Sequence, residues 1–180
     1  MTSLLTPQKL KLLKRMAFQA YQAPGCVAEV GVYRGGSAKV IAAEIPSSPF
    51  YLFDTFTGLP APGPHDGPVL RAGRFAATVD EVHRTLRGSP NRSIFYQQGV
   101  FPESAAGLEA LRFCFVHVDV DLFRSVSDCC VWFAPRMTQG GIMVFDDYGC
   151  KLTPGCPLAV DAYFGDRAQA TPEGPAVVHF

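Results

Sequence analysis

Acidic side chains close two apolar runs of the sequence. Asp119 and Asp121 follow one run, and Asp146 and Asp147 follow the next. If the two runs are adjacent strands of a parallel sheet, their carboxyl ends meet in one crevice and bring the carboxylates close together. Such carboxylates repel each other unless their pKa values rise or a cation lies among them, and hard oxygen ligands select magnesium, calcium or manganese. The pattern predicts a divalent cation site, with magnesium as the default ion; the alternative is that these aspartates bond to loop amides and cap turns.

A glycine-rich turn, E-V-G-V-Y-R-G-G at 29–36, follows the first predicted strand. Glycine lets the chain turn tightly into a helix, so that backbone N–H groups approach a ligand closely. The turn differs from the dinucleotide pattern G-x-G-x-x-G, because an acid two residues before Gly31 repels a pyrophosphate. S-adenosylmethionine fits instead, since it has no diphosphate and Glu29 is placed to receive its positively charged end.

Asp54 ends the second predicted strand, 23 residues after Gly31. In doubly wound folds an acid at this position accepts hydrogen bonds from ribose hydroxyls. Each feature alone has a structural interpretation, the glycine turn as a connection and Asp54 as a cap for the turn at Thr55. Together, at the ends of two strands, they favour a nucleoside site.

The elements that position these residues alternate along the chain between short apolar runs and helical patterns. This alternation is typical of βαβ units and a parallel sheet. We predict strands at 26–31, 50–53, 93–96, 113–118 and 142–145, with the last opened by Gly140-Gly141, a closing edge strand at 176–180, and helices at 4–21, 37–44, 79–87, 125–135 and 157–164. The fold class is therefore α/β, with a doubly wound, mostly parallel sheet in a single domain over 1–180 that begins with a helical segment at 1–24.

The segment 55–78 is rich in proline and glycine and too long for an ordinary connection. Loops of this length in compact domains are functional or disordered. We predict that this one is a lid over the active site.

The composition excludes several classes of partner. The formal net charge is zero, and no run of like charges marks a surface for nucleic acid or an anionic membrane. No apolar stretch approaches the ~18 residues of a membrane span, and the amphipathic start lacks the pattern of an export signal. The six cysteines form no Cys-x-x-Cys pair, which favours reduced thiols. We expect a cytoplasmic protein whose partner is a small molecule.

Five stretches of the sequence, in order, resemble the macrocin O-methyltransferase family, which methylates sugar hydroxyls during macrolide and aminocoumarin tailoring. They are E-V-G-V-Y-R-G-G at 29–36, Y-L-F-D-T-F-T-G-L-P at 51–60, G-V-F-P-E-S at 99–104, F-V-H-V-D-V-D-L-F at 115–123 and G-G-I-M-V-F-D-D-Y-G at 140–149. The resemblance runs from about residue 25 to 165. It implies a sheet of the class I S-adenosylmethionine-dependent methyltransferase type, which is Rossmann-like.

The resemblance also implies the site. Its magnesium ligands are expected to be Asp119, Asp146 and Asp147, with Asp119 preferred to Asp121 because the family is similar in metal geometry to the catechol and caffeoyl-coenzyme A enzymes. The expected contacts to the methyl donor are Glu29, Gly31, Tyr33, Ser37, Asp54, Thr55, Gln98, Gly99 and Asp119.

These features together predict an O-methyltransferase that uses S-adenosylmethionine and a divalent cation and acts on a small-molecule hydroxyl, of a sugar or another natural product with vicinal hydroxyls. Asp119 is the predicted catalytic residue, as metal ligand and proton acceptor, and Tyr148 and His65 are weaker candidates for the base. Two alternatives stay open: a regulatory module that binds S-adenosylmethionine without methylating, and a metal-independent methyltransferase whose aspartates bind the acceptor directly. Only one clear strand follows residue 164, which implies a shortened closing hairpin with an exposed sheet edge or a homo-oligomer that covers it.

Overall fold

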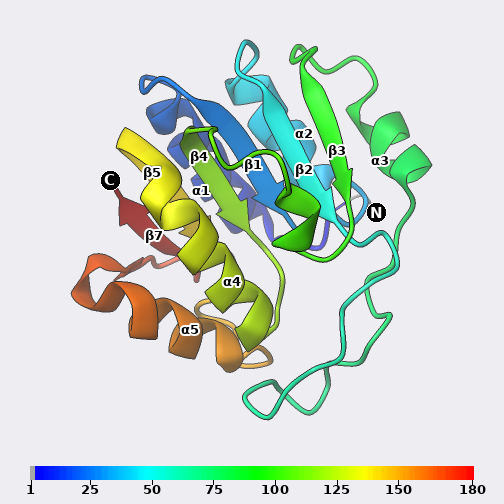
Figure 1. The fold of residues 1–180 in the computed structure, drawn as a ribbon, viewed down its shortest axis with the longest axis vertical. Coiled ribbons are helices and arrows are strands. Elements are labelled where there is room, and N and C mark those ends of the chain that lie inside the picture. The colour runs from blue at the N-terminus through cyan, green and yellow to red at the C-terminus, as the bar shows by residue number, and fades with distance from the viewer. Residues whose placement is uncertain (1–2) are drawn as a thin grey trace.

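The computed structural model describes residues 3–180, which form a seven-stranded sheet in the order β3-β2-β1-β4-β5-β7-β6 (Figure 1). The strands are β1 (Cys26–Val30), β2 (Phe50–Asp54), β3 (Ile94–Gln98), β4 (Phe113–Val118), β5 (Met137–Phe145), β6 (Gln169–Ala170) and β7 (Ala176–His179). β1 to β5 pair in parallel, whereas β7 runs antiparallel to both β5 and β6. The predicted α/β fold with a mostly parallel sheet is confirmed.

Helices cover both faces of the sheet (Figure 1). On one face lie α1 (Pro7–Ala20), α2 (Gly36–Glu44) and α3 (Val79–Leu86), and on the other lie α4 (Phe123–Phe133) and α5 (Gly155–Phe164). Three single 3₁₀ turns are η1 (Glu103–Ala105), η2 (Ala134–Arg136) and η3 (Gly165–Arg167). Residues 1 and 2 of the predicted N-terminal segment lie outside the described residues. This doubly wound arrangement brings the carboxyl ends of the parallel strands to one edge of the sheet.

Side-chain caps explain where two of the helices begin. The Thr6 side chain accepts a hydrogen bond from the backbone at the start of α1, and the next residue is a proline, which suits the first helical position. Thr78 and Glu81 form a reciprocal capping box at the start of α3. α3 begins at residue 79 as predicted, whereas α1 begins at Pro7, three residues after its predicted start at residue 4.

α4 begins with a cap from a distant part of the chain. The backbone N–H of Phe123 donates to Asp66 Oδ1 at 2.7 Å, and Asp66 Oδ2 accepts from the N–H of Gly63 at 2.7 Å. The long connection 55–78 is therefore fastened to the first turn of α4. Since no local residue provides this cap, the sequence pattern placed the start of the helix two residues late.

The C-terminal strands differ from the prediction. β5 begins at Met137 rather than 142, and Gly140, with φ +79°, lies inside the strand where its pairing with β4 shifts register. In a sequence, a glycine at an irregularity inside a strand looks the same as a glycine just before a strand, so the predicted start of this strand was too late. The predicted edge strand, β7, is an inner strand, because the two-residue β6 pairs with its outer side. The closing hairpin is present but short.

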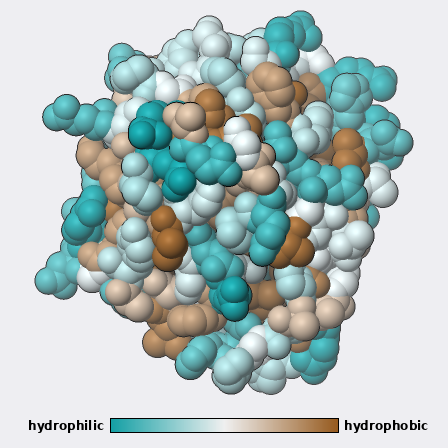
Figure 2. Space-filling view, in the orientation of Figure 1, coloured by the Kyte–Doolittle hydropathy of each residue, from teal (hydrophilic) through white to brown (hydrophobic). Residues whose placement is uncertain are grey.

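The surface offers no sign of a membrane span. None of the helices within residues 3–180 combines the length and hydropathy that a bilayer crossing needs. On the face that carries α4 and α5, hydrophobic residues are scattered among hydrophilic ones (Figure 2). Scattered exposed apolar residues of this kind are normal for a folded domain.

Candidate active site

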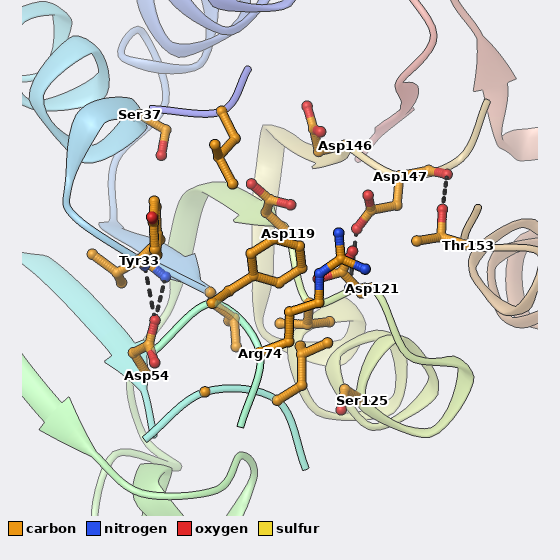
Figure 3. A pocket seen from close by; sticks show the side chains of 18 of the residues that line it. Tyr33, Ser37, Asp54, Arg74, Asp119, Asp121, Ser125, Asp146, Asp147 and Thr153 are labelled. Atoms are coloured by element: carbon orange, nitrogen blue, oxygen red, sulfur yellow. Dashed lines mark hydrogen bonds between the residues drawn. The ribbon is translucent and has the colours of Figure 1, made fainter. Parts of the chain in front are cut away.

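A cavity of about 470 Å³ opens at the carboxyl ends of β1, β2, β4 and β5 (Figure 3). Ligands bind at this edge in doubly wound sheets. Two further segments contribute to the wall, residues 3–9 at the N-terminal end and the connection 55–78. The cavity therefore draws on segments that are far apart in the sequence.

Asp54 braces the turn that follows β1. Its Oδ2 accepts hydrogen bonds from the N–H groups of Val32 at 2.7 Å and Tyr33 at 2.9 Å, and its Oδ1 accepts from Phe56 N–H at 2.8 Å (Figure 3). Tyr33 has a positive φ of 49°, so the carboxylate holds a turn that the backbone alone disfavours. Asp54 thus fixes the geometry of the glycine-rich turn and also lines the cavity.

Gly31 lies directly against the end of β4. Its φ is +86°, and a Cβ on this residue would come within 1.8 Å of the carbonyl oxygen of Asp119. The Asp119 N–H donates to Val30 O at 2.9 Å, which joins the same two strand ends. The close approach of these backbones requires glycine and places the turn beside the Asp119 carboxylate.

Most of the predicted donor-binding residues meet at this cavity. Those that line it are Gly31, Tyr33, Ser37, Asp54, Thr55, Gly99 and Asp119. Thr55 donates through its hydroxyl to Gly58 O at 2.7 Å, which closes the first turn of the long connection. Gln98, at the end of the edge strand β3, is exposed and does not line the cavity.

Glu29 lies below the cavity rather than in its wall. Its carboxylate is fully buried, and its Oε1 lies 2.8 Å from Nδ1 of His117, its register partner on β4. Glu29 Oε2 and His117 Nε2 have no hydrogen-bond partner within residues 3–180. The pair links β1 to β4 two residues before Gly31 and Asp119, so it supports the strand ends from beneath.

Asp119, Asp146 and Asp147 lie close together in the wall of the cavity (Figure 3). Each offers one oxygen, and the three oxygens lie within 4.8 Å of one another. Burial, followed by the charges of the two neighbouring carboxylates, raises the pKa of Asp119 well above its usual range. Burial and nearby carboxylates also raise the pKa of Asp147 to about 8. The negative charges of this cluster are therefore not fully compensated, and a bound cation would compensate them.

Asp121 occupies a separate position at the rim of this cluster. Its backbone has a φ of +58°, and its N–H donates to Asp147 Oδ2 at 3.0 Å. Burial raises the pKa of Asp121 to about 6, and the Arg74 guanidinium acts in the opposite direction. Its main-chain contact orients Asp147, while its own side chain lies toward Arg74 (Figure 3).

Lys9 is a site residue that the sequence analysis missed. Its ammonium donates to Asp146 Oδ2 at 2.7 Å and to Asp146 O at 3.0 Å. Burial lowers the pKa of Lys9, but the carboxylates led by Asp146 outweigh burial, so the net pKa is raised and the ammonium stays charged. The two residues are 137 positions apart, and no sequence motif links them. Only the packing of α1 against the sheet brings them together.

The two weaker candidates for a base lie outside the cavity wall. Tyr148 donates its hydroxyl to Asp161 at 2.8 Å, and His65 packs against the Phe123 ring with 4.6 Å between ring centroids. Neither side chain lines the cavity. Of the proton acceptors named from the sequence, only Asp119 reaches it.

The sequence matches a known protein family over nearly its whole length. The family described as Macrocin-O-methyltransferase (TylF) matches residues 3–173.

The chain belongs to the macrocin-O-methyltransferase family.

Two curated relatives of this family member come from Streptomyces. The 8-demethyl-8-(2,3-dimethoxy-alpha-L-rhamnosyl)-tetracenomycin-C 4'-O-methyltransferase of Streptomyces olivaceus is 27% identical over 156 residues, 79% of this chain and 59% of the relative. The demethyldecarbamoylnovobiocin O-methyltransferase of Streptomyces niveus is 26% identical over 155 residues, 78% of this chain and 58% of the relative. The chain thus spans about three fifths of the length of the curated relatives it matches.

Solved structures share the fold. The O-methyltransferase NovP superimposes with a TM-score of 0.82 at 20% identity, covering 99% of this chain and 81% of that one. A calicheamicin methyltransferase superimposes with a TM-score of 0.80 at 21% identity, covering 96% and 78%. The macrocin-O-methyltransferase family member therefore has the class I S-adenosylmethionine-dependent methyltransferase fold predicted from its sequence.

Proposed function

We propose that this chain is an O-methyltransferase that binds S-adenosylmethionine in the cavity and methylates a hydroxyl of a sugar carried by a natural product. The proposal includes a divalent cation held by Asp119, Asp146 and Asp147. The observation that carries it is the meeting of three carboxylate oxygens, within 4.8 Å of one another, beside the turn at Gly31.

The donor assignment is supported by the strand ends that form the cavity. Gly31 and Asp54 give the glycine turn and acidic strand end that suit a nucleoside with a positively charged tail. A relative in fold, an O-methyltransferase from Bacillus cereus solved in complex with SAH, has a TM-score of 0.66 at 12% identity and covers 98% of this chain and 82% of that one. In our proposal the donor occupies the part of the cavity between Tyr33, Ser37 and Gly99.

The cation assignment is supported by the chemistry of the carboxylates. Hard oxygen ligands suit magnesium or manganese, and three carboxylates leave positions for the acceptor. Burial first, and then the neighbouring carboxylates, raise the pKa values of Asp119 and Asp147, and a dication between them would relieve both effects. When bound there, a divalent cation lowers the pKa of an acceptor hydroxyl and helps to orient it.

The side chains of the protein provide orientation and a proton acceptor. In the proposed step the acceptor oxygen attacks the methyl carbon, the carbon–sulfur bond breaks, and Asp119 takes the hydroxyl proton. The products are a methyl ether and S-adenosylhomocysteine. In-line placement of the reacting groups at about 3–3.5 Å supplies a large part of the rate acceleration. We propose that the connection 55–78 closes over the acceptor as a lid.

The test is a methyl-transfer assay with a labelled donor and the demethylated glycosides named for the two Streptomyces relatives. We expect a labelled methyl ether whose formation stops when EDTA removes divalent cations and returns when magnesium is added. Asp119→Asn is expected to lose about a hundredfold or more in rate while its binding of S-adenosylhomocysteine stays measurable in calorimetry. Asp161→Asn, which lies away from the cavity, is the matched control.

Two outcomes of this assay oppose the proposal in different ways. Transfer that survives complete removal of cations identifies a metal-independent methyltransferase. Tight donor binding without transfer to any glycoside or phenol acceptor identifies a binding module instead.

A further inference from the structure

Lys9 places a positive charge beside the proposed cation site. Its Nζ contacts both the carboxylate of Asp146, at 2.7 Å, and the main-chain oxygen of the same residue, at 3.0 Å. The side chain is only 19% exposed, and its Cε lies close to Gly174, where an added Cβ would come within 3.7 Å. The ammonium is therefore held in place by packing on the stem and by two hydrogen bonds at the head.

The charges that line the cavity are unbalanced. Within residues 3–180 the lining contains five aspartates and two cationic residues, Lys9 and Arg74. Arg74 lies toward Asp121 (Figure 3), and of these two cationic residues only Lys9 hydrogen-bonds to one of the three proposed cation ligands. In the cation-free protein, Lys9 is thus the counter-ion of this group of three carboxylates, through its hydrogen bond to Asp146.

We infer that Lys9 and a divalent cation compete for the carboxylate of Asp146. This inference rests on the cation site of the proposed function. A dication among the three carboxylates lies within a few ångströms of the ammonium, where like charges repel strongly because water is largely excluded. The ammonium also hydrogen-bonds to Asp146 Oδ2, one of the two oxygens through which this carboxylate can bind a metal ion.

Competition at Asp146 links the cation to the wall of the cavity. Lys9 belongs to the first turn of α1, and residues 3–6 immediately before it line the same cavity. When a divalent cation takes the carboxylate, the Lys9 side chain keeps only its bond to the main-chain oxygen of Asp146. Cation binding therefore loosens the N-terminal wall of the cavity, because Lys9 loses its bond to the Asp146 carboxylate.

The test is a titration of the whole, chelator-treated protein with manganese, with free Mn²⁺ followed by its EPR signal. Lys9→Met and Lys9→Gln remove the charge, and we expect each to bind Mn²⁺ about tenfold more tightly than the wild type. Lys9→Arg keeps the charge and is expected to stay near the wild-type affinity. Lys14→Met is the matched control, because Lys14 lies on the same helix but pairs with Glu44 at 3.4 Å, away from the cavity.

Hydrogen exchange provides a second readout. In the wild type, saturating Mn²⁺ is expected to speed amide exchange in residues 3–10, whereas in Lys9→Met exchange there is expected to be fast with and without the ion. This readout keeps the inference testable if one neutral variant folds poorly, since the wild-type response needs no substitution.

The outcomes separate this inference from the proposed function. If the wild type binds Mn²⁺ and the neutral variants bind it equally or more weakly, the competition is refuted while the cation site stands. If neither the wild type nor the neutral variants bind Mn²⁺, both the cation site and the competition are refuted. Binding that appears or tightens only in the neutral variants supports the inference.

Discussion

The backbone at Gly31 lies so close to the carbonyl oxygen of Asp119 that a methyl group on residue 31 would come within 1.8 Å of that oxygen. This contact joins the turn after β1, where we place the methyl donor, to the strand end that carries the proposed base. The relative position of donor and base is thus set by main-chain packing rather than by flexible side chains.

Gly31→Ala tests this contact directly. We expect a loss of about 3 kcal/mol in the free energy of unfolding, because the new methyl group must displace the end of β4. Gly88→Ala is the control, since Gly88 has a similar φ of +80° but nothing within 4 Å of an added Cβ. It is expected to lose about 1 kcal/mol from backbone strain alone. Urea denaturation of both variants measures the difference, and equal losses would contradict the importance of the contact.

Asp54→Ala is expected to weaken the binding of S-adenosylhomocysteine by at least about tenfold. The substitution removes the acceptor for three backbone N–H groups, two of which, from Val32 and Tyr33, belong to the glycine-rich turn, and bonds to a charged group are worth about 1.5–3 kcal/mol each. Isothermal calorimetry gives the affinity, with Asp161→Ala as an acidic control outside the cavity. An unchanged affinity would show that the turn keeps its shape without this brace.

The cation-free protein is expected to lose stability as the pH rises from about 4 to about 8. Burial and neighbouring carboxylates raise the pKa of Asp147 to about 8 in the folded chain, whereas the unfolded chain ionises near pH 4. Over that range the folded state holds a proton that the unfolded state has lost, so rising pH favours unfolding by up to about 1.4 kcal/mol per pH unit for one proton.

Melting temperatures of EDTA-treated protein between pH 5 and 8.5 measure this dependence. Saturating magnesium is expected to flatten it, because the ion binds the ionised carboxylates, and Asp147→Asn is expected to flatten it without the ion. A slope that Asp147→Asn leaves unchanged would assign the effect to other groups.

Asp66→Ala is expected to raise the KM for the acceptor severalfold while the affinity for S-adenosylhomocysteine changes little. Asp66 fastens the connection 55–78 to the first turn of α4, and this connection forms part of the cavity wall. Loss of the cap is also expected to lower the free energy of unfolding by about 1 kcal/mol. Val69→Ala, at an exposed position of the same connection that does not line the cavity, is the control. Equal KM values in the two variants would mean that the loop holds its place without Asp66.

The elements that the sequence predicted well are those with a local signal. β4 is buried at all six positions, as its apolar run indicates, and α3 has a complete capping box at Thr78 and Glu81. The sequence also predicted that the acidic strand ends lie close together, because parallel strands bring their carboxyl ends to one edge whatever their exact register. Asp119, Asp146 and Asp147 do meet in space.

The features that the sequence did not predict depend on contacts between distant segments. Lys9 reaches Asp146 across 137 positions, and Asp66 caps a helix 57 positions later. Glu29 was expected to face the donor, yet it lies buried against His117, because a residue at a strand end can point into either face of the sheet. β6 has only two residues and carries no periodic pattern at all.

The cavity wall is formed by two kinds of segment, strand ends of the sheet and segments outside it, and they differ in how well they tolerate substitution. Gly31 and Asp54 belong to strand ends locked by backbone contacts, whereas the connection 55–78 and residues 3–6 are outside the sheet. Under the proposed function, substitutions in the two outer segments would reshape the acceptor side without disturbing the donor side. Libraries confined to those two segments would then be the route to new acceptors by directed evolution.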